Sequence, residues 1–191
     1  MIEPQILLGA YASGYFPMAD SCKGEVRWYS PDPRAIIPLE GLKISRSLKQ
    51  VLRKKIFEIR LNTAFADVIG NCAERKETWI SDLIVRSYLG LHRLGFAHSV
   101  EAWKDGRLAG GLYGVSLGAA FFGESMFSAV PNASKVALVF LVERLRRKQY
   151  DLLDSQIITP HIGRMGAVEI SREKYLFLLG SAIKKKCSFI E

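Results

Sequence analysis

The residues that decide the fold run from Ser99 to Ser128 and read SVEAWKDGRLAGGLYGVSLGAAFFGESMFS. Lys104-Asp105-Gly106 is a strong two-strand turn signal, with strand-like residues before it and over 108–115 after it. Leu117-Gly118 breaks the chain a second time and leads into the apolar run 119–124, which suits a covered strand. The sequence therefore predicts three consecutive antiparallel strands.

Glu124 is a carboxylate at the end of that apolar run, before a helix start for which Asn132 or Ser134 is the expected cap. A charge in this place must meet a partner or a ligand. An ion pair with an Arg or Lys at a strand end and a functional carboxylate both satisfy this requirement. The residue pattern leaves these two alternatives open.

The segments around these strands alternate between helical and extended patterns. Apolar periodicity and polar caps predict helices over residues 5–13, 44–54, 64–73, 82–94, 134–148 and 171–184. Further strands are expected at 58–61 and 150–156, and the rest of the first 34 residues, rich in Gly and Pro, is expected to be a loop. Together these elements predict an α+β fold with a mixed sheet.

The composition is that of a globular protein, with 191 residues of which 49% are hydrophobic and 24% charged. No apolar run reaches the roughly 18 to 20 residues of a membrane span, and the N-terminus lacks a signal sequence, so we expect a cytoplasmic protein. The net charge of +8 favours an acidic partner, because a positive potential raises encounter rates with polyanions.

The cysteines and histidines give no sign of a metal centre. Cys22, Cys72 and Cys187 are odd in number and far apart, which indicates neither a disulfide framework nor a zinc site. The histidines form no ligand cluster, and His98, at the start of an expected strand, fits a hydrogen-bonded structural role. We expect no metal.

Short motifs in one order along nearly the whole chain resemble the leucyl/phenylalanyl-tRNA-protein transferase family. They are Gly14 to Pro17, Trp28 to Arg34, Ile44 to Ser47, Thr78-Trp79-Ile80, His98 to Glu101, Gly110 to Gly114, Gly123 to Ser128, Asp154-Ser155-Gln156 and Gly166-Ala167. The resemblance implies a GCN5-related N-acyltransferase fold for residues 35–191, preceded by a shortened version of the family's small N-terminal domain at residues 1–34.

The reaction implied by the resemblance is aminoacyl transfer. The α-amino group of an acceptor protein's N-terminal Arg or Lys attacks the ester carbonyl of Leu-tRNA or Phe-tRNA, with Met as a further candidate donor. The product carries an N-degron that marks it for degradation. Because the ester is already activated, positioning, proton acceptance and oxyanion stabilisation suffice. The resemblance implies no cofactor and a monomer.

Asp154 and Gln156 stand two apart on one expected strand, so both side chains project to the same face. By resemblance to the family's Asp-x-Gln pattern, Asp154 holds or deprotonates the incoming amine, and Gln156 orients it or hydrogen-bonds the tetrahedral oxygen. On the residue pattern alone, a polar pair on an edge strand that faces water is the alternative.

Donor binding is assigned by resemblance to Glu124 and to an apolar side-chain pocket. Glu124 matches a glutamate that contacts the amino group of the esterified residue. The apolar positions are Met126, Phe121, Leu112, Leu138, Leu141 and Leu153. A flexible Met wall accepts Leu or Phe, although periodicity alone also fits an ordinary core.

Trp79 is a candidate platform for the terminal adenine of tRNA, because bases stack on aromatic faces. Well-known members of the family carry a second Trp where this chain has Met18. The resemblance therefore implies a clamp of Trp79 and Met18 with a different shape. Packing is the alternative role for a Trp in a loop.

A basic helix face is the expected contact for the tRNA acceptor stem. The residues that match the family here are Arg46, Lys49, Arg53 and Lys54. Phosphate contacts of this kind are sensitive to salt and largely independent of sequence. A solvated helix face is the alternative. A second basic run, Arg144 to Lys148, has no assigned partner.

Two other functions fit parts of the sequence. A coenzyme A-dependent N-acyltransferase would share the fold, but the helix after Glu124 is not preceded by a glycine-rich loop that presents backbone N–H groups to a pyrophosphate. A catalytically silent tRNA-binding module would bind RNA in a salt-sensitive manner without turnover.

Overall fold

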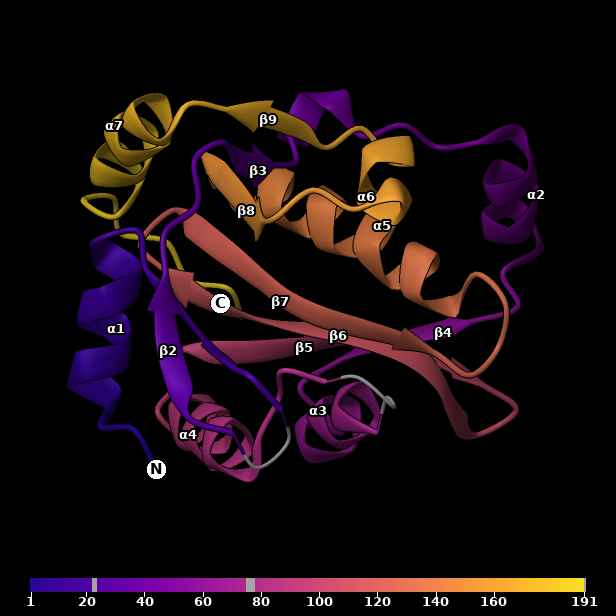
Figure 1. The fold of residues 1–191 in the computed structure, drawn as a ribbon. Helices are drawn as coiled ribbons and strands as arrows, with labels where there is room; N and C mark the ends of the chain where they lie inside the picture. Colours follow the sequence, from indigo (N-terminus) through magenta and orange to yellow (C-terminus); the bar gives the residue numbers. More distant parts are fainter. Residues whose placement is uncertain (22–23, 75–77, 191) are drawn as a thin grey trace.

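The computed structural model describes residues 1–21, 24–74 and 78–190, and its centre is a mixed β-sheet (Figure 1). Within these residues the sheet has seven strands in the order β4-β5-β6-β7-β8-β3-β9. Their bounds are β3 Arg34–Ile36, β4 Glu58–Leu61, β5 Ala97–Lys104, β6 Arg107–Leu117, β7 Ala120–Ser128, β8 Leu152–Gln156 and β9 Val168–Ile170. A separate hairpin pairs β1 (Phe16–Ala19) with β2 (Val26–Tyr29). Cys22 lies outside the described residues.

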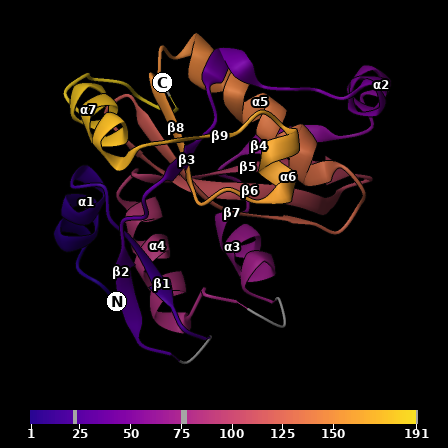
Figure 2. The same cartoon turned by 45° about the horizontal axis from the view of Figure 1, so that its top comes forward.

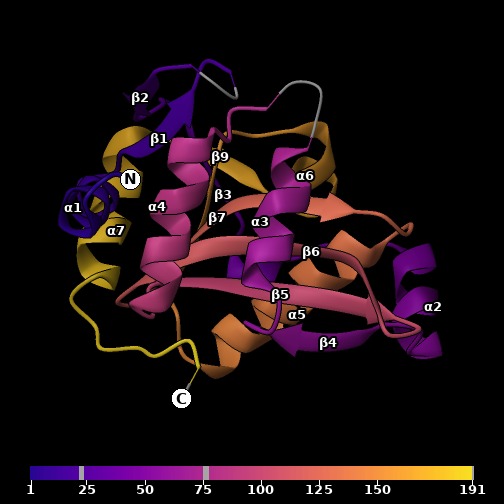
Figure 3. The same ribbon diagram turned by 90° about the horizontal axis from the view of Figure 1, so that it is seen from below.

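Helices cover both faces of the sheet. They are α1 Pro4–Ala12, the 3-10 turn η1 Leu39–Gly41, α2 Arg46–Lys54, α3 Phe65–Ala73, α4 Asp82–Arg93, α5 Ala133–Arg147, α6 Pro160–Arg164 and α7 Arg172–Ala182. Figure 3 shows α3 and α4 against the face of the sheet opposite to α5. Each face has its own hydrophobic core, and β7 and β8 supply both through the period-2 alternation of their side chains.

The antiparallel meander predicted from the residues 99–128 is confirmed. β5 pairs with β6 and β6 with β7, both antiparallel, with Asp105 and Gly106 at positive φ in the first turn. β7 continues to Ser128, four residues beyond the predicted end, because its second half still pairs with Gly110 to Tyr113 of β6. The polar residues after Phe122 had concealed this extension.

Glu124 occupies a β-bulge within β7. Tyr113 pairs with Ser125 and Gly114 pairs with Gly123, so Glu124 is the extra residue that has no pairing partner in β6. A bulge bends its strand and redirects the side chain it carries. The sequence placed Glu124 at the end of the strand, whereas the structure places it at an irregularity in the middle.

The expected helix starts are largely confirmed. Ser45, Ser81 and Ser171 each accept a hydrogen bond from a backbone N–H in the first turn of α2, α4 and α7. Asn132 precedes α5 at φ 71°, but its side chain makes no capping bond to the helix. The glycine stop also holds, since Gly95 follows α4 at φ 80°.

The expectation of a loop after the first helix was wrong in part. Residues 16–29 contain the β1-β2 hairpin, which lies beside α1 and α4 (Figure 2). β3 and β9 were also missed, and each is only three residues long. Strands this short carry too little alternation to be recognised, and they form here because they extend an existing sheet.

β7 and β8 are parallel neighbours that pair over only part of their length and then separate. They pair only at Ala120 with Leu152, Phe121 with Leu153 and Phe122 with Asp154. Beyond these pairs β7 bulges, while β8 goes on to pair with β3 through Asp154 and Gln156. The centre of the sheet therefore opens at the level of Glu124 and Gln156. No described helix is long and apolar enough to cross a membrane.

Candidate active site

A cavity of about 790 Å³ lies where β7 and β8 separate. Its size falls within the range of small-molecule sites. Its walls reach both hydrophobic layers, since Tyr113 and Phe127 line it from one core and Leu112 and Leu153 from the other. The opening between the strands thus gives access to side chains that an unbroken sheet would keep apart.

Asp154 is fully buried, and the surrounding side chains occupy both oxygens of its carboxylate. Arg34 donates from Nε to Oδ1 at 3.0 Å and from Nη2 to Oδ2 at 2.7 Å. The Tyr175 hydroxyl donates to Oδ2 at 2.8 Å, and the backbone N–H of Gln156 donates to Oδ1 at 2.9 Å. Such a bidentate Arg–carboxylate pair fixes position and orientation together.

Arg34 is itself buried and fixed by several contacts. It is 0% exposed, its guanidinium lies 4.8 Å from the Phe16 ring centroid and 4.4 Å from that of Tyr175, and its Nη1 donates to the Gly14 carbonyl at 3.0 Å. Burial by itself would lower the pKa of Arg34, but pairing with Asp154 raises it overall. Arg34 therefore stays charged inside the protein, and its contacts join β3, β8, α7 and the loop before β1.

Glu124 faces the same opening from β7, in a different environment. The hydroxyl of Tyr11 donates to Oε1 at 2.7 Å and that of Tyr88 donates to Oε2 at 3.0 Å. The two hydroxyl groups are also hydrogen-bonded to each other. Burial raises the pKa of Glu124 to about 7, against the tyrosine hydrogen bonds, which lower it, while the charge of Asp154 adds to the rise.

Gln156 connects the two carboxylates. Its backbone N–H binds Asp154, and its side-chain Nε2 lies 3.4 Å from Oε1 of Glu124. Its backbone has φ 60°, a left-handed conformation that is uncommon outside glycine. The bond from its N–H to Asp154 supports this conformation, so the orientation of Gln156 depends on that carboxylate. Because β8 lies between β7 and β3, the edge-strand alternative for this polar pair is wrong.

The apolar wall lies beside these polar groups. The expected positions that line the cavity are Leu112, Met126, Leu138, Leu141 and Leu153. Phe121 does not line it: its ring is 0% exposed and packs against Phe189, with the centroids 5.2 Å apart. The resemblance assigned Phe121 to the pocket, but its ring is buried in the core that packs against α5.

Trp79 and Met18 also line the cavity, from the side of the β1-β2 hairpin. The backbone N–H of Ala19 donates to the Trp79 carbonyl at 3.1 Å, which fixes the hairpin against the segment that precedes α4. The structure thus brings both expected residues of the adenine clamp to one wall, with Phe16 beside them.

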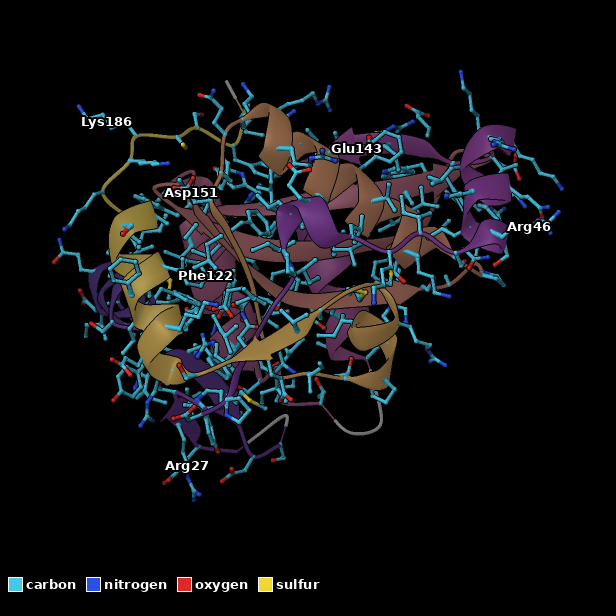
Figure 4. All side chains as sticks on the ribbon, turned by 90° about the horizontal axis from the view of Figure 1, so that it is seen from above. Arg27, Arg46, Phe122, Glu143, Asp151 and Lys186 are labelled. Atoms are coloured by element: carbon cyan, nitrogen blue, oxygen red, sulfur yellow. The ribbon has the colours of Figure 1, made fainter. Side chains whose placement is uncertain are left out.

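The expected tRNA-binding residues lie on α2, away from the cavity. Arg46, Lys49, Arg53 and Lys54 are all exposed, while Leu48 packs into the core. Figure 4 shows Arg46 on the outer side of α2, at the periphery of the molecule. The second basic run is partly occupied within the protein, because Arg144 binds the carbonyls of Phe189 and Ile190 and Arg146 pairs with Glu40.

His98 has the structural role expected from the sequence. It is buried, its Nδ1 lies 3.0 Å from Nδ2 of Asn62, and its ring stacks on Phe189. Burial lowers the pKa of His98 to about 4. Among the described residues, no group of three or more His, Cys, Asp or Glu side chains could hold a metal ion.

Sequence reasoning missed the residues that hold the two carboxylates: Arg34, Tyr175, Tyr11 and Tyr88. One signal was available, since Arg34 opens the apolar run Arg34-Ala35-Ile36-Ile37 and is a charge in a segment that is otherwise suited to burial. The tyrosines come from α1, α4 and α7, far apart in the chain, and no local pattern reveals that their hydroxyl groups converge.

Comparisons with known proteins agree along the whole chain. A family model described as leucyl/phenylalanyl-tRNA protein transferase matches residues 36–180, and a model described as the N-terminal domain of that transferase matches residues 1–32. The leucyl/phenylalanyl-tRNA–protein transferase of Chlorobaculum tepidum is 52% identical over 194 residues, covering 100% of both chains. That of Rubrobacter xylanophilus is 54% identical over 189 residues, covering 98% of each.

Among solved structures, the chain is similar to L-PGS from Bacillus licheniformis, with 11% identity and a TM-score of 0.45. That match covers 80% of this chain and 49% of the other.

Proposed function

The chain belongs to the leucyl/phenylalanyl-tRNA protein transferase family, and we propose that it moves Leu or Phe from aminoacyl-tRNA to the N-terminal Arg or Lys of acceptor proteins. Aminoacyl transfer from tRNA to a protein N-terminus follows from the family. The choice of donor amino acids, the basic acceptor residue and the creation of an N-degron for protein degradation belong to the proposal.

The observation that carries the proposal is the meeting of Glu124, Asp154 and Gln156 beside an apolar wall, in one cavity at the opening of the sheet. A donor ester needs a pocket for its side chain and polar groups at its amino and carbonyl groups. Leucine and methionine side chains supply a wall that adapts to Leu or Phe, and the carboxylate of Glu124 is placed to contact the amino group of the esterified residue.

The reaction joins an amine to an activated ester. The acceptor's α-ammonium loses one proton, its nitrogen lone pair attacks the ester carbonyl, and a C–N bond forms as the bond to the ribose oxygen breaks. A second proton leaves the nitrogen, and the ribose oxygen gains one. We assign acceptance of the first proton to Glu124, whose pKa of about 7 suits exchange with an amine near neutral pH.

Asp154 takes a positioning role in this proposal. In the described part of the chain, the hydrogen bonds to its carboxylate come from Arg34, Tyr175 and the Gln156 backbone, so an incoming amine would have to displace one of them. Asp154 instead holds the backbone of Gln156, whose amide is then oriented toward the cavity. That amide is placed to hydrogen-bond the reacting groups beside Glu124.

The remaining assignments concern the tRNA and the fold. We propose that Trp79 and Met18 hold the terminal adenine, and that Arg46, Lys49, Arg53 and Lys54 bind the acceptor stem. The short parallel pairing of β7 and β8, followed by their separation, supports the GCN5-related N-acyltransferase fold.

The proposal further includes a cytoplasmic monomer that needs no cofactor. A division into an N-terminal segment 1–34 and a transferase domain 35–191 is kept in it, although a boundary after Arg34 falls inside β3.

The test is transfer of labelled Phe or Leu from charged tRNA to a peptide that begins with Arg. Wild type and Asp154→Ala are compared side by side, and a peptide of the same sequence that begins with Ala is the control. We expect transfer by the wild type to the Arg peptide alone, and loss of that transfer in Asp154→Ala.

Equal transfer to the Ala and Arg peptides would contradict the proposed acceptor rule. Binding of tRNA without transfer to either peptide would contradict the proposed acceptor class. Unimpaired transfer by Asp154→Ala would contradict the assignment of this cavity as the reaction site.

A further inference from the structure

His161 lines the cavity, but the proposed reaction gives it no role. It comes from α6, and its Nε2 atom is buried with no hydrogen-bond partner in the described part of the chain. Buried polar atoms in proteins are almost always paired, so one that faces a cavity calls for a partner from the ligand. A hydroxyl or an N–H group of a bound molecule would meet this need.

Two cations act on this histidine. Burial lowers the pKa of His161, and the nearby charges of Lys135 and Arg164 lower it further, which places both cations within electrostatic reach of the ring. The backbone N–H of Lys43 donates to the Met165 carbonyl at 2.9 Å, so Lys43 lies beside the residue that follows Arg164. We call Lys43, Lys135 and Arg164 the cationic rim.

The charges of the cationic rim are available for a ligand. Lys43 and Arg164 are exposed and Lys135 is half-buried. None of them forms an ion pair within residues 1–21, 24–74 and 78–190. Lys135 Nζ makes a long hydrogen bond of 3.5 Å to the side-chain oxygen of Asn132. By contrast, Arg146 and Lys185 are paired with carboxylates elsewhere on the surface.

The rim also lies on the route from the cavity to the basic helix. Lys43 precedes Arg46, the first residue of α2, by three positions. Figures 1 and 2 both show α6 between the end of β8 and α2. Cations thus continue from α2 through Lys43 and Arg164 to Lys135, near His161, which lines the cavity.

We propose that the cationic rim binds the phosphodiester groups of the single-stranded 3′ end of the donor RNA, with His161 hydrogen-bonded to a sugar hydroxyl inside the cavity. The inference rests on the proposed function, because it takes aminoacyl-tRNA as the donor. A single strand carries one phosphate per nucleotide, so a line of separate cations matches it better than one deep anion pocket. His161, neutral at neutral pH, contributes a hydrogen bond rather than charge.

The test compares two non-hydrolysable donors that differ in two cytidine nucleotides and the phosphodiester groups that join them. One is adenosine that carries phenylalanine through a 3′ amide, and the other is the trinucleotide CCA with the same 3′ amide. Binding of each is measured by calorimetry over a range of salt concentrations, with wild type and the Lys43→Ala, Lys135→Ala and Arg164→Ala variants.

We expect each variant to bind the trinucleotide about two- to fivefold more weakly, the scale of an exposed ion pair, and to bind the nucleoside as the wild type does. The salt slope for the trinucleotide should fall by about 0.7 for each phosphate contact removed. Arg147→Ala is the matched control, since Arg147 is an exposed cation at the other end of α5, and it should change neither affinity.

Unchanged trinucleotide binding in all of the rim variants, or equal loss for both donors, would overturn the inference. Failure of the proposed function can be told apart from failure of this inference. If wild type binds both donors as expected but transfers nothing from charged tRNA to the Arg peptide, phosphate binding by the cationic rim is supported and the assignment of the acceptor is contradicted. His161→Ala gives a further check, because it should weaken binding of the nucleoside as well as of the trinucleotide.

Discussion

Two carboxylates face the same opening of the sheet, and they differ in burial and in the groups that bind them. Asp154, on β8, is fully buried and binds a buried guanidinium, a tyrosine and a backbone N–H. Glu124, on the bulge of β7, is half-buried, and its side-chain hydrogen bonds come from two tyrosines and one amide. No cation touches Glu124 in the described residues.

The difference separates a structural task from a chemical one. A carboxylate held by Arg34 in a bidentate pair has a fixed position and orientation, which suits a residue that positions Gln156. A carboxylate that lacks a direct cation and is partly desolvated has a raised pKa, which suits a residue that exchanges protons. The predictions below test whether this division holds.

The largest effect is expected from Arg34→Ala. It leaves the buried carboxylate of Asp154 without its cation, and breaking a buried pair in this way costs about 3–5 kcal/mol of folding stability. Urea unfolding followed by circular dichroism measures the change. Arg34→Lys is the control, because it keeps the charge but loses the bidentate geometry. Its folding stability should lie between that of the wild type and that of Arg34→Ala. A loss below about 1 kcal/mol in Arg34→Ala would show that this pair does not anchor the site.

Glu124→Gln is expected to cost activity more than stability. The amide keeps the shape of the side chain but cannot accept the proton of the amine, so kcat for transfer should fall about 10²- to 10⁴-fold. Affinity for uncharged tRNA should not change, since the proposed contact of Glu124 is with the esterified amino acid and the residue lies away from α2. Single-turnover transfer and filter binding measure the two quantities. Transfer that keeps more than about a tenth of the wild-type rate would argue against proton acceptance by Glu124.

The raised pKa of Glu124 also predicts how stability varies with pH. Between its ordinary value of 4.5 and about 7, the folded protein holds this proton while the unfolded chain has lost it. Stability from this group is therefore present below pH 4.5 and declines as pH rises toward 7, by on the order of 1 kcal/mol per unit. The free energy of unfolding, measured over this pH range in wild type and Glu124→Gln, isolates the contribution of Glu124, because stability should decline less in the variant. Parallel curves of stability against pH would contradict a raised pKa of Glu124.

The smallest effect is expected from a pair of tyrosine variants. Tyr88→Phe removes a hydrogen bond that lowers the pKa of Glu124, so the midpoint of the pH–rate profile should move up by about 0.5 to 1 unit. Tyr175→Phe removes a comparable bond from Asp154 and should leave the midpoint in place while reducing stability by about 1 kcal/mol. If both variants move the midpoint equally, the two carboxylates do not act separately.

Much of the fold could be predicted from the sequence because its longer elements have strong local signals. The turn at Asp105-Gly106 and the serine caps of α2, α4 and α7 are examples. β3 and β9 are different, since they exist only by pairing with each other and, in the case of β3, with β8. Their stability comes from tertiary contacts that no local window contains.

The residues that meet in the cavity were predicted, but the contacts that hold them were not. Asp154, Gln156 and Glu124 were singled out by the resemblance, and all three line the cavity. Tyr88 and Tyr175 supply the contacts that distinguish the carboxylates, and they approach from helices on different sides of the opening. The β-bulge at Glu124 likewise depends on the register between β6 and β7, which the alternation of residues does not fix.

The division of labour between the carboxylates is tested most directly by the rate of single-turnover transfer against pH from 5.5 to 8, in wild type, Glu124→Gln and Asp154→Asn. The account predicts a rate that rises through a midpoint near pH 7 in the wild type and no such midpoint in Glu124→Gln. In Asp154→Asn it predicts a reduced rate with a midpoint that persists at a lower pH, because the charge of Asp154 raises the pKa of Glu124. A midpoint that persists in Glu124→Gln and vanishes in Asp154→Asn would contradict it, because Asp154 would then be the residue that takes the proton.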